Sequence, residues 1–253
     1  MAVSIDRVYQ KVLALANKEQ RGYITPQEFN LFADQAQIDI FEQYFYDLNQ
    51  FKRVAGNDTY YSDMVNVLEE KISLFEKTSG NQGPSATNTK NVGTQDEFYE
   101  SSYSMPIDFY RLVGIKRVHP IRGPISEIEK LNIMDYERAI QSPLTRGAVN
   151  RPICSFRGDI IHVAPVEGGG SMPNIKIEYI RKPFPPSWTY IVVNEKPLYN
   201  SSAADHQDFE LHDSEQKNLV IKILQLAGIS IKDYNVTQAA AQEEVKTIQQ
   251  QKS

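Results

Sequence analysis

The sequence predicts an α+β fold: an N-terminal helical bundle, a central region of short, mostly antiparallel strands, and C-terminal helices. Apolar residues recur at helical spacing before residue 78 and again after residue 213. Between these regions, alternating segments are separated by turn residues and prolines, which is typical of short strands near sheet edges. We expect five parts, namely a helical part at 1–78, a flexible polar loop at 79–97, a β-rich part with one inserted helix at 98–212, a helix packing on the core at 213–233, and a C-terminal docking arm at 234–253.

The start of the long second helix carries the sharpest local signal. Thr25-Pro26-Gln27-Glu28 is a capping box with proline at the first helical position. Ile24 and Phe29 flank this box at the positions of a hydrophobic staple. The helix should run to about Arg53 and follow a first helix that Ser4 can cap.

The long helix has two apolar stripes. The first consists of Phe29, Ala33, Ala36, Ile40, Tyr44, Leu48 and Phe51, and the second of Leu31, Ile38, Phe41 and Phe45. A helix with two apolar faces is buried on two sides, either within its own bundle or against a neighbouring subunit. A third helix, from Asp58 or Ser62 to Lys77, is available for the bundle. We assign the second stripe to a helix-bundle contact or a subunit interface.

The polar stretch at 78–97 is rich in glycine, asparagine and threonine. A segment of this length without regular structure is uncommon inside a compact domain and is usually functional or disordered. We expect a floppy surface loop in the free chain, with ordering on assembly as the alternative.

The β-rich part contains several strand and hairpin signals. Ile153–Phe156 and Ile160–Ala164 flank a turn at Arg157-Gly158-Asp159, which predicts a hairpin. Residues 174–180 alternate, with their apolar side chains on one face. Further strands are expected at 112–118, 188–193 and 196–199, and a helix at 133–141.

The C-terminal part has a helical pattern that weakens toward its end. Asp213-Ser214-Glu215-Gln216 has the spacing of a capping box, and it opens an apolar helix that Gly228 should end. Beyond it, Ala241, Val245 and Ile248 form only a narrow stripe. Such a stripe buries little area, so we expect this arm to become ordered by docking on a partner.

Composition excludes several classes of protein. The net charge of −5 argues against a dedicated nucleic-acid-binding domain but suits a surface that DNA slides past. Cys154 is the only cysteine, so neither an intrachain disulfide nor a four-cysteine metal site can form. We see no signal peptide and no apolar run of ~18 residues, and therefore expect a cytoplasmic protein without membrane contact.

The polar motifs give little support for catalysis. Asp208, Glu210 and His212 would share one face of an extended strand, where a solvated face explains them better than a metal site. Cys154 has apolar neighbours, which favours a buried thiol over a nucleophile. Gly168-Gly169-Gly170-Ser171 lacks the lysine and hydroxyl group of a phosphate-binding loop. We expect no catalytic residue, no cofactor and no metal.

Three other features have equally plain explanations. His119 and His162 show no paired spacing, the basic run 116–122 alternates like a solvated strand face, and Pro183–Pro186 forms a stiff corner.

Short segments occur along the chain in the order found in phage neck and tail-tube subunits. They are Met105–Gly114, Ile160–Pro165, Ile177–Pro183, Phe209–Gln216 and Leu219–Asp233, followed by a Gln/Glu-rich terminal helix. The segment Arg21–Phe32 is similar to the opening of such proteins in crAss-like podoviruses. Across nearly its whole length, the chain resembles the portal-proximal ring protein, or head-to-tail adaptor, of crAss-like phages.

This resemblance implies a structural role. It implies a ring of twelve copies under the portal, a channel for DNA that is contacted without sequence specificity, and C-terminal segments that reach the portal. The expected partners are other copies of the chain, the portal protein and the next tail ring, in a virion neck assembled in the host cytoplasm. The alternatives are another tail-layer ring, such as a tail tube or fibre-attachment ring, and a phage-encoded hydrolase using Asp208, Glu210 and His212.

Overall fold

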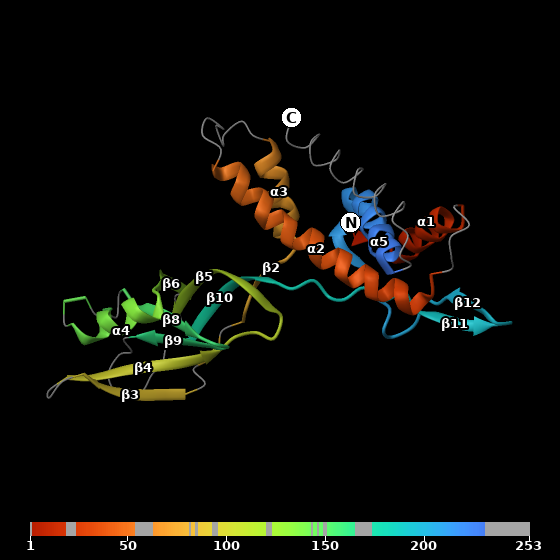
Figure 1. The fold of residues 1–253 in the computed structure, drawn as a ribbon. Coiled ribbons are helices and arrows are strands. Elements are labelled where there is room, and N and C mark those ends of the chain that lie inside the picture. The colour runs from red at the N-terminus through yellow and green to blue at the C-terminus, as the bar shows by residue number, and fades with distance from the viewer. Residues whose placement is uncertain are drawn as a thin grey trace. The chain divides into compact units, whose positions relative to one another are not determined.

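The computed structural model describes residues 2–18, 24–53, 63–80, 82–83, 86–92, 96–119, 123–142, 144–145, 147–148, 151–164 and 174–230. The chain forms two compact units, which Figure 1 shows with their elements labelled. Unit 1 combines residues 1–74 with 183–253, and unit 2 consists of residues 75–182. The predicted α+β class is confirmed, with helices at both ends of the chain and strands between them.

The helices of unit 1 form a bundle around an apolar core. They are α1 (Ile5–Lys18), α2 (Pro26–Arg53), α3 (Asp63–Ser73) and α5 (Gln216–Ser230). Helix α5 packs against both α1 and α2, and α3 packs against α2. The first apolar stripe of α2 faces this core, because Phe29, Ala33, Ala36, Ile40 and Tyr44 are all buried.

The predicted capping box at the start of α2 is confirmed by its hydrogen bonds. The backbone N–H of Thr25 donates to Glu28 Oε2 at 2.9 Å, and the N–H of Glu28 donates to Thr25 Oγ1 at 3.3 Å. Ile24 and Phe29 are both buried on either side of the box, as a staple requires. These two hydrogen bonds satisfy donors that the first helical turn leaves without intrahelical partners.

The second predicted capping box, at 213–216, forms differently. Residues Asp213–Glu215 form a 3₁₀ turn, η1, ahead of α5, and its N-cap is His212. The His212 ring nitrogen Nδ1 accepts from the backbone N–H of Ser214 at 3.3 Å. Glu215 is buried and contacts Lys71, so it serves the core and not the cap.

Three short antiparallel pairings complete unit 1. Strand β1 (Ala2–Val3) pairs with β13 (Phe209–His212), and β11 (Tyr190–Val193) pairs with β12 (Lys196–Tyr199). A single bridge joins Ser187 to Gln207. The sequence placed residues 183–212 with the β-rich part, whereas the structure assigns them to the helical unit.

The described residues of unit 2 form two sheets and one helix. The four-stranded sheet has the order β2-β10-β5-β6, built from Glu76–Thr78, Asn174–Arg181, Phe109–His119 and Gly123–Glu127. The five-stranded sheet has the order β3-β4-β9-β8-β7, built from Ala86–Val92, Asp96–Ser104, Ile160–Ala164, Ile153–Arg157 and Glu129–Lys130. Among the described strands only β7 and β8 pair in parallel. Helix α4 covers Ile133–Gln141, as predicted.

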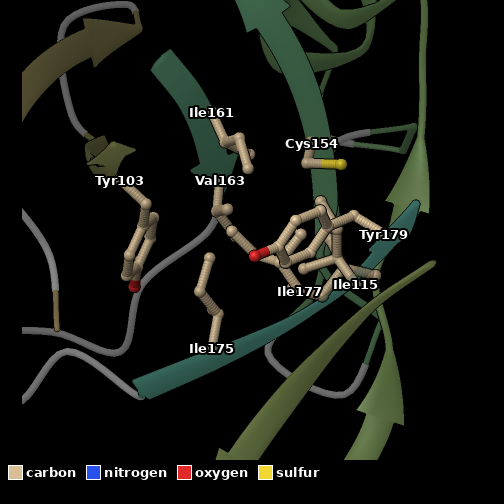
Figure 2. Packing of buried hydrophobic residues seen from close by; sticks show 9 residues of the cluster. Tyr103, Ile115, Cys154, Ile161, Val163, Ile175, Ile177 and Tyr179 are labelled. Carbon is tan, nitrogen blue, oxygen red and sulfur yellow. The ribbon is translucent and has the colours of Figure 1, made fainter. Parts of the chain in front are cut away.

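The two sheets of unit 2 pack face to face. Figure 2 shows the side chains that meet there, including Cys154 and Ile161 from one sheet and Ile115, Ile177 and Tyr179 from the other. Helix α4 covers the opposite face of the five-stranded sheet, where Tyr136 and Ile140 pack on Ile153 and Ala164. Unit 2 is therefore layered as sheet, sheet and helix, with the larger apolar cluster between the sheets.

The prediction of a flexible loop at 79–97 is wrong for much of this segment. Strand β3 lies inside this segment and pairs with β4 from Ala86 to Val92. Backbone hydrogen bonds make this pairing, and they do not depend on apolar side chains. A polar edge strand of this kind therefore escaped a prediction that relied on composition.

The described helices include none that combines the length and the apolar character of a membrane span.

Candidate assembly interface

Trp188 anchors the segment that carries the β11–β12 hairpin. Its indole Nε1–H donates to Asp6 Oδ1 of α1 at 3.1 Å, and its ring lies 4.2 Å from the Tyr9 ring, centroid to centroid. The rings of Tyr190 and Tyr199, at the base of the hairpin, stack on Trp188 at 5.8 and 5.9 Å. The base of the hairpin is therefore held on α1 by aromatic packing and a partly buried hydrogen bond.

Two side-chain amides of α2 bind the same segment through its backbone. Asn30 Nδ2 donates to the Trp188 carbonyl at 3.3 Å, and the Trp188 N–H donates to Asn30 Oδ1 at 2.9 Å. Two helical turns later, Gln37 Nε2 donates to the Phe184 carbonyl at 2.8 Å. The Gln37 Oε1 atom also accepts from the backbone N–H of Glu210 at 3.0 Å. Residues 184–188, which we call the strap, therefore run along α2.

The β11–β12 hairpin turns sharply at its tip. Asn194 and Glu195 have φ angles of 49° and 64°, which place both residues in the left-handed region. Two such residues between paired strands are typical of the tight turn that matches strand twist. With a tight tip and an anchored base, the hairpin is a well-defined projection of unit 1 (Figure 1).

One face of this hairpin is apolar and uncovered. Ile191 pairs with Leu198 and Val193 pairs with Lys196, so these four side chains share a face. Ile191, Val193 and Leu198 are 52%, 43% and 50% exposed, and Lys196 is exposed too. Lys196 has no ion-pair partner among the described residues. We call these four residues the hairpin face.

A second, partly exposed surface lies on the N-terminal half of α2. Leu31, Asp34 and Ile38 share one side of the helix at i, i+3 and i+7. Leu31 is 72% exposed, whereas Asp34 and Ile38 are half-buried. Partial burial raises the pKa of the Asp34 carboxyl, which has no hydrogen-bond or ion-pair partner among the described residues. We call these three residues the α2 face. Gln37, which binds the Phe184 carbonyl of the strap, directly precedes Ile38 in the helix.

The predicted interface stripe on α2 divides into two halves. Phe41 and Phe45 are buried within the chain and pack edge to face at 5.1 Å. Contacts from α3 reach this half of α2, since Lys71 lies over the Tyr44 ring and Lys52 pairs with Glu69. For Phe41 and Phe45, the stripe is therefore a helix-bundle contact, and these two side chains are not available to a partner. Leu31 remains exposed and Ile38 is half-buried, and Ala241, Val245 and Ile248 lie outside the described residues.

The residues considered as metal ligands each bind a different backbone N–H group. Asp208 Oδ1 accepts from Ile5 at the start of α1 at 2.8 Å, Glu210 Oε2 accepts from Phe184 at 2.8 Å, and His212 caps η1. An anionic side chain at a helix N-terminus is stabilising. The expectation of a merely solvated face is therefore wrong, because these side chains tie α1, the strap and α5 to β13. The described residues bring together no three histidine, cysteine or acidic side chains around a shared metal position.

A buried polar row lies beneath α4 in unit 2. Tyr136 donates its hydroxyl to Glu100 Oε1 at 2.9 Å, and His162 Nδ1 lies 3.1 Å from the same oxygen. Ser155 is directly opposite His162 in the strand register. Serine, histidine and glutamate in this arrangement resemble nucleophilic machinery, but Ser155 is fully buried under α4. Because no substrate can reach its hydroxyl while α4 is in place, the row is best explained as a buried structural layer, in which the Ser155 hydroxyl has no hydrogen-bond partner among the described residues.

Cys154 lies in the apolar cluster between the two sheets (Figure 2). Burial raises the pKa of its thiol to about 12, and nearby Lys130 offsets this only partly. Since the thiolate is the reactive form, a thiol with this pKa is a poor nucleophile.

The other predicted features give no second site. Lys116 pairs with Glu178 at 2.6 Å across β5 and β10, so the start of the basic run is part of a mixed-charge face. The glycine loop 168–171 and residues 120–122 lie outside the described residues. In comparisons with known proteins, no family model matches the sequence and no curated protein matches it.

Sequence reasoning missed the hairpin face and the two side-chain amides of α2 that bind the strap. One signal could have found the hairpin face: Ile191-Val192-Val193 is an unbroken aliphatic run beside a turn, which places apolar side chains on both faces of a short strand. No local pattern marks Asn30 and Gln37, because their partners are more than 140 residues away.

Proposed function

We propose that this protein is a structural subunit of a tailed bacteriophage and that its copies form a ring joining the capsid portal to the tail. The proposal includes no catalytic step. In this role the ring surrounds the passing genome, and the net charge of −5 keeps the protein from binding DNA tightly.

The hairpin face is the observation that carries this proposal. Three aliphatic side chains with 43–52% exposure stand on a hairpin whose base is fixed by Trp188. Exposed apolar groups on a fixed projection are costly for a lone chain and useful to a subunit that buries them on assembly. The order of short segments shared with phage neck subunits favours the same role.

The hydrogen bonds of Asp208, Glu210 and His212 support a structural role over the hydrolase alternative. A hydrolase would need these side chains to converge on a substrate. Each of them instead satisfies a backbone donor of a different segment, at Ile5, Phe184 and Ser214. The same observation does not choose between a portal-proximal ring and another tail-layer ring.

The proposal is tested by mixing the purified protein with portal complexes and imaging the mixture by electron microscopy. We expect a ring of twelve copies, as the resemblance implies, on the tail-facing side of the portal. Attachment to purified tails but not to portals would favour the tail-layer alternative. A chain that stays monomeric and binds neither would overturn the proposal.

A further inference from the structure

The hairpin face and the α2 face are complementary in chemistry. The hairpin face presents three aliphatic side chains around one cation, Lys196. The α2 face presents Leu31 and Ile38 around one anion, Asp34. Neither Lys196 nor Asp34 has a counter-charge among the described residues.

We infer that the hairpin face of one copy docks on the α2 face of a second copy, where Lys196 pairs with Asp34. This inference rests on the proposed ring, because it names the contact between neighbouring subunits. The two surfaces are different patches of the same unit, so the contact is heterologous. In an open row of copies joined by such contacts, the first copy has one unused face and the last copy has the other. A closed ring uses both faces of every copy.

Charge complementarity selects a second copy as the occupant. A carboxylate that is already partly desolvated gains from a cation arriving with apolar neighbours, because further burial without a counter-charge would be costly. Lys196 arrives in that setting, flanked on its own face by Val193 and Leu198. Within one copy the pair does not form, although each chain carries both halves.

The anchoring of both surfaces makes the contact specific. The hairpin is fixed through Trp188, which Asn30 of α2 holds through two hydrogen bonds. The α2 face begins at Leu31, the next residue along the helix. Docking between two pre-organised surfaces loses little conformational entropy, which favours a small interface that is repeated around a ring.

Reversal of each charge tests the inference directly. The variants are Asp34→Lys, Lys196→Asp and the two combined, and sedimentation velocity measures the self-association of each. We expect each single variant to weaken association about tenfold or more, as expected for a desolvated pair turned into a repulsion. The combined variant should regain most of the lost affinity, because it restores an ion pair with the opposite polarity.

Two matched controls separate this pair from general charge effects. Glu42→Lys changes the charge of an exposed residue elsewhere on α2, and Lys11→Asp does so on α1. Both should associate like the unmodified chain. Circular dichroism of every variant should show an unchanged fold, since all four positions lie at or near the surface.

Four outcomes would overturn the inference. Single reversals without effect, or a combined variant that does not recover, would exclude the Lys196–Asp34 pair while rings on the portal still supported the proposed function. Normal self-association with lost portal binding in the single variants would assign the two faces to a different protein. A chain that never associates, alone or with portals, would contradict both the proposed function and this contact.

Discussion

Asn30 holds Trp188 by both sides of its amide group: Nδ2 donates to the Trp188 carbonyl, and Oδ1 accepts from the Trp188 N–H. A backbone residue paired in this way is bound as it would be in a β-ladder, although its partner is a helical side chain. This pairing joins two segments 158 positions apart in the sequence. It determines where the strap, and therefore the hairpin face, lies on the helical unit.

Asn30→Ala should destabilise the protein by about 2–3 kcal/mol. The substitution removes two hydrogen bonds and leaves a partly buried N–H and carbonyl of Trp188 without partners. The shift in the midpoint of urea denaturation measures this loss. Asn49→Ala, at an exposed position of the same helix, is the matched control and should change stability by less than about 0.5 kcal/mol. Equal midpoints for the two variants would show that the Asn30 amide is dispensable.

Lys71→Met should cost about 3–5 kcal/mol of stability, because it leaves the Glu215 carboxylate buried without its cation. The Lys71 Nζ and Glu215 Oε1 atoms lie 2.6 Å apart, with the two side chains 15% and 4% exposed. Asn218 donates to the other carboxylate oxygen, and burial together with the Glu215 charge raises the pKa of Tyr44. The double variant with Glu215→Leu should recover much of the loss in the same denaturation assay. No recovery would mean that the lysine stem, and not its charge, holds α3.

Cys154 should resist thiol reagents in the native protein at pH 8. Its pKa of about 12 leaves on the order of one molecule in ten thousand as thiolate at that pH, and the side chain is fully buried. Labelling with a maleimide should become fast in denaturant, and Cys154→Ser should not label under either condition. Rapid labelling of the folded chain would contradict the packing between the two sheets.

The same thiol should make the protein less stable at high pH. The pKa of Cys154 is raised in the folded chain, so this contribution to stability is complete below the unfolded value near 9 and is lost as pH rises toward 12. Between these two values the unfolded chain ionises and the folded chain does not. Cys154→Ala removes the contribution of this thiol to the pH dependence. The stability of the variant should therefore fall less steeply than that of the unmodified chain between pH 9 and 11.

Local signals predicted the elements of this fold, and distant contacts decided how they were grouped. The capping box at Thr25 fixed the start of α2, which the structure describes as far as Arg53. The hairpin around Gly158, whose φ of 60° suits glycine, was also predictable from its turn. Residues 183–212 were assigned to the wrong part because their contacts are with Asp6, Asn30 and Gln37, which no local pattern links to them.

The candidate interface was predictable only in part. Helical periodicity placed Leu31, Ile38, Phe41 and Phe45 on one stripe, but it could not show how far along that stripe α3 reaches. Lys71 of α3 lies over the ring of Tyr44, and the half of the stripe near it is buried. The pairing of Lys196 with hydrophobic neighbours required the register of β11 and β12, which depends on the turn at 194–195.

Removal of residues 235–253 should leave the melting temperature nearly unchanged and abolish attachment to portal-bearing heads. This prediction rests on the sequence alone, since these residues lie outside the described part of the chain. The stripe of Ala241, Val245 and Ile248 offers only a few kcal/mol at about 25 cal/mol per Å², against the cost of ordering a dozen or more residues. Truncated protein that completes infectious particles at the normal yield would contradict a docking role.

Aspartate substitutions at Leu31 and Phe41 should have opposite consequences, although both residues belong to one stripe of α2. Leu31 is 72% exposed, so Leu31→Asp should change stability by less than about 0.5 kcal/mol and weaken self-association. Phe41 is 1% exposed, so Phe41→Asp should cost more than about 4 kcal/mol, because it buries a charge and removes a packed ring.

Thermal denaturation followed by circular dichroism separates these two effects, and sedimentation velocity reports assembly. A Phe41→Asp variant that keeps its stability and loses only the ability to assemble would show that the whole stripe lies at a subunit interface. A Leu31→Asp variant that assembles normally would instead remove the α2 face from the interface, because burying an aspartate there against the aliphatic side chains of the hairpin face would cost desolvation free energy.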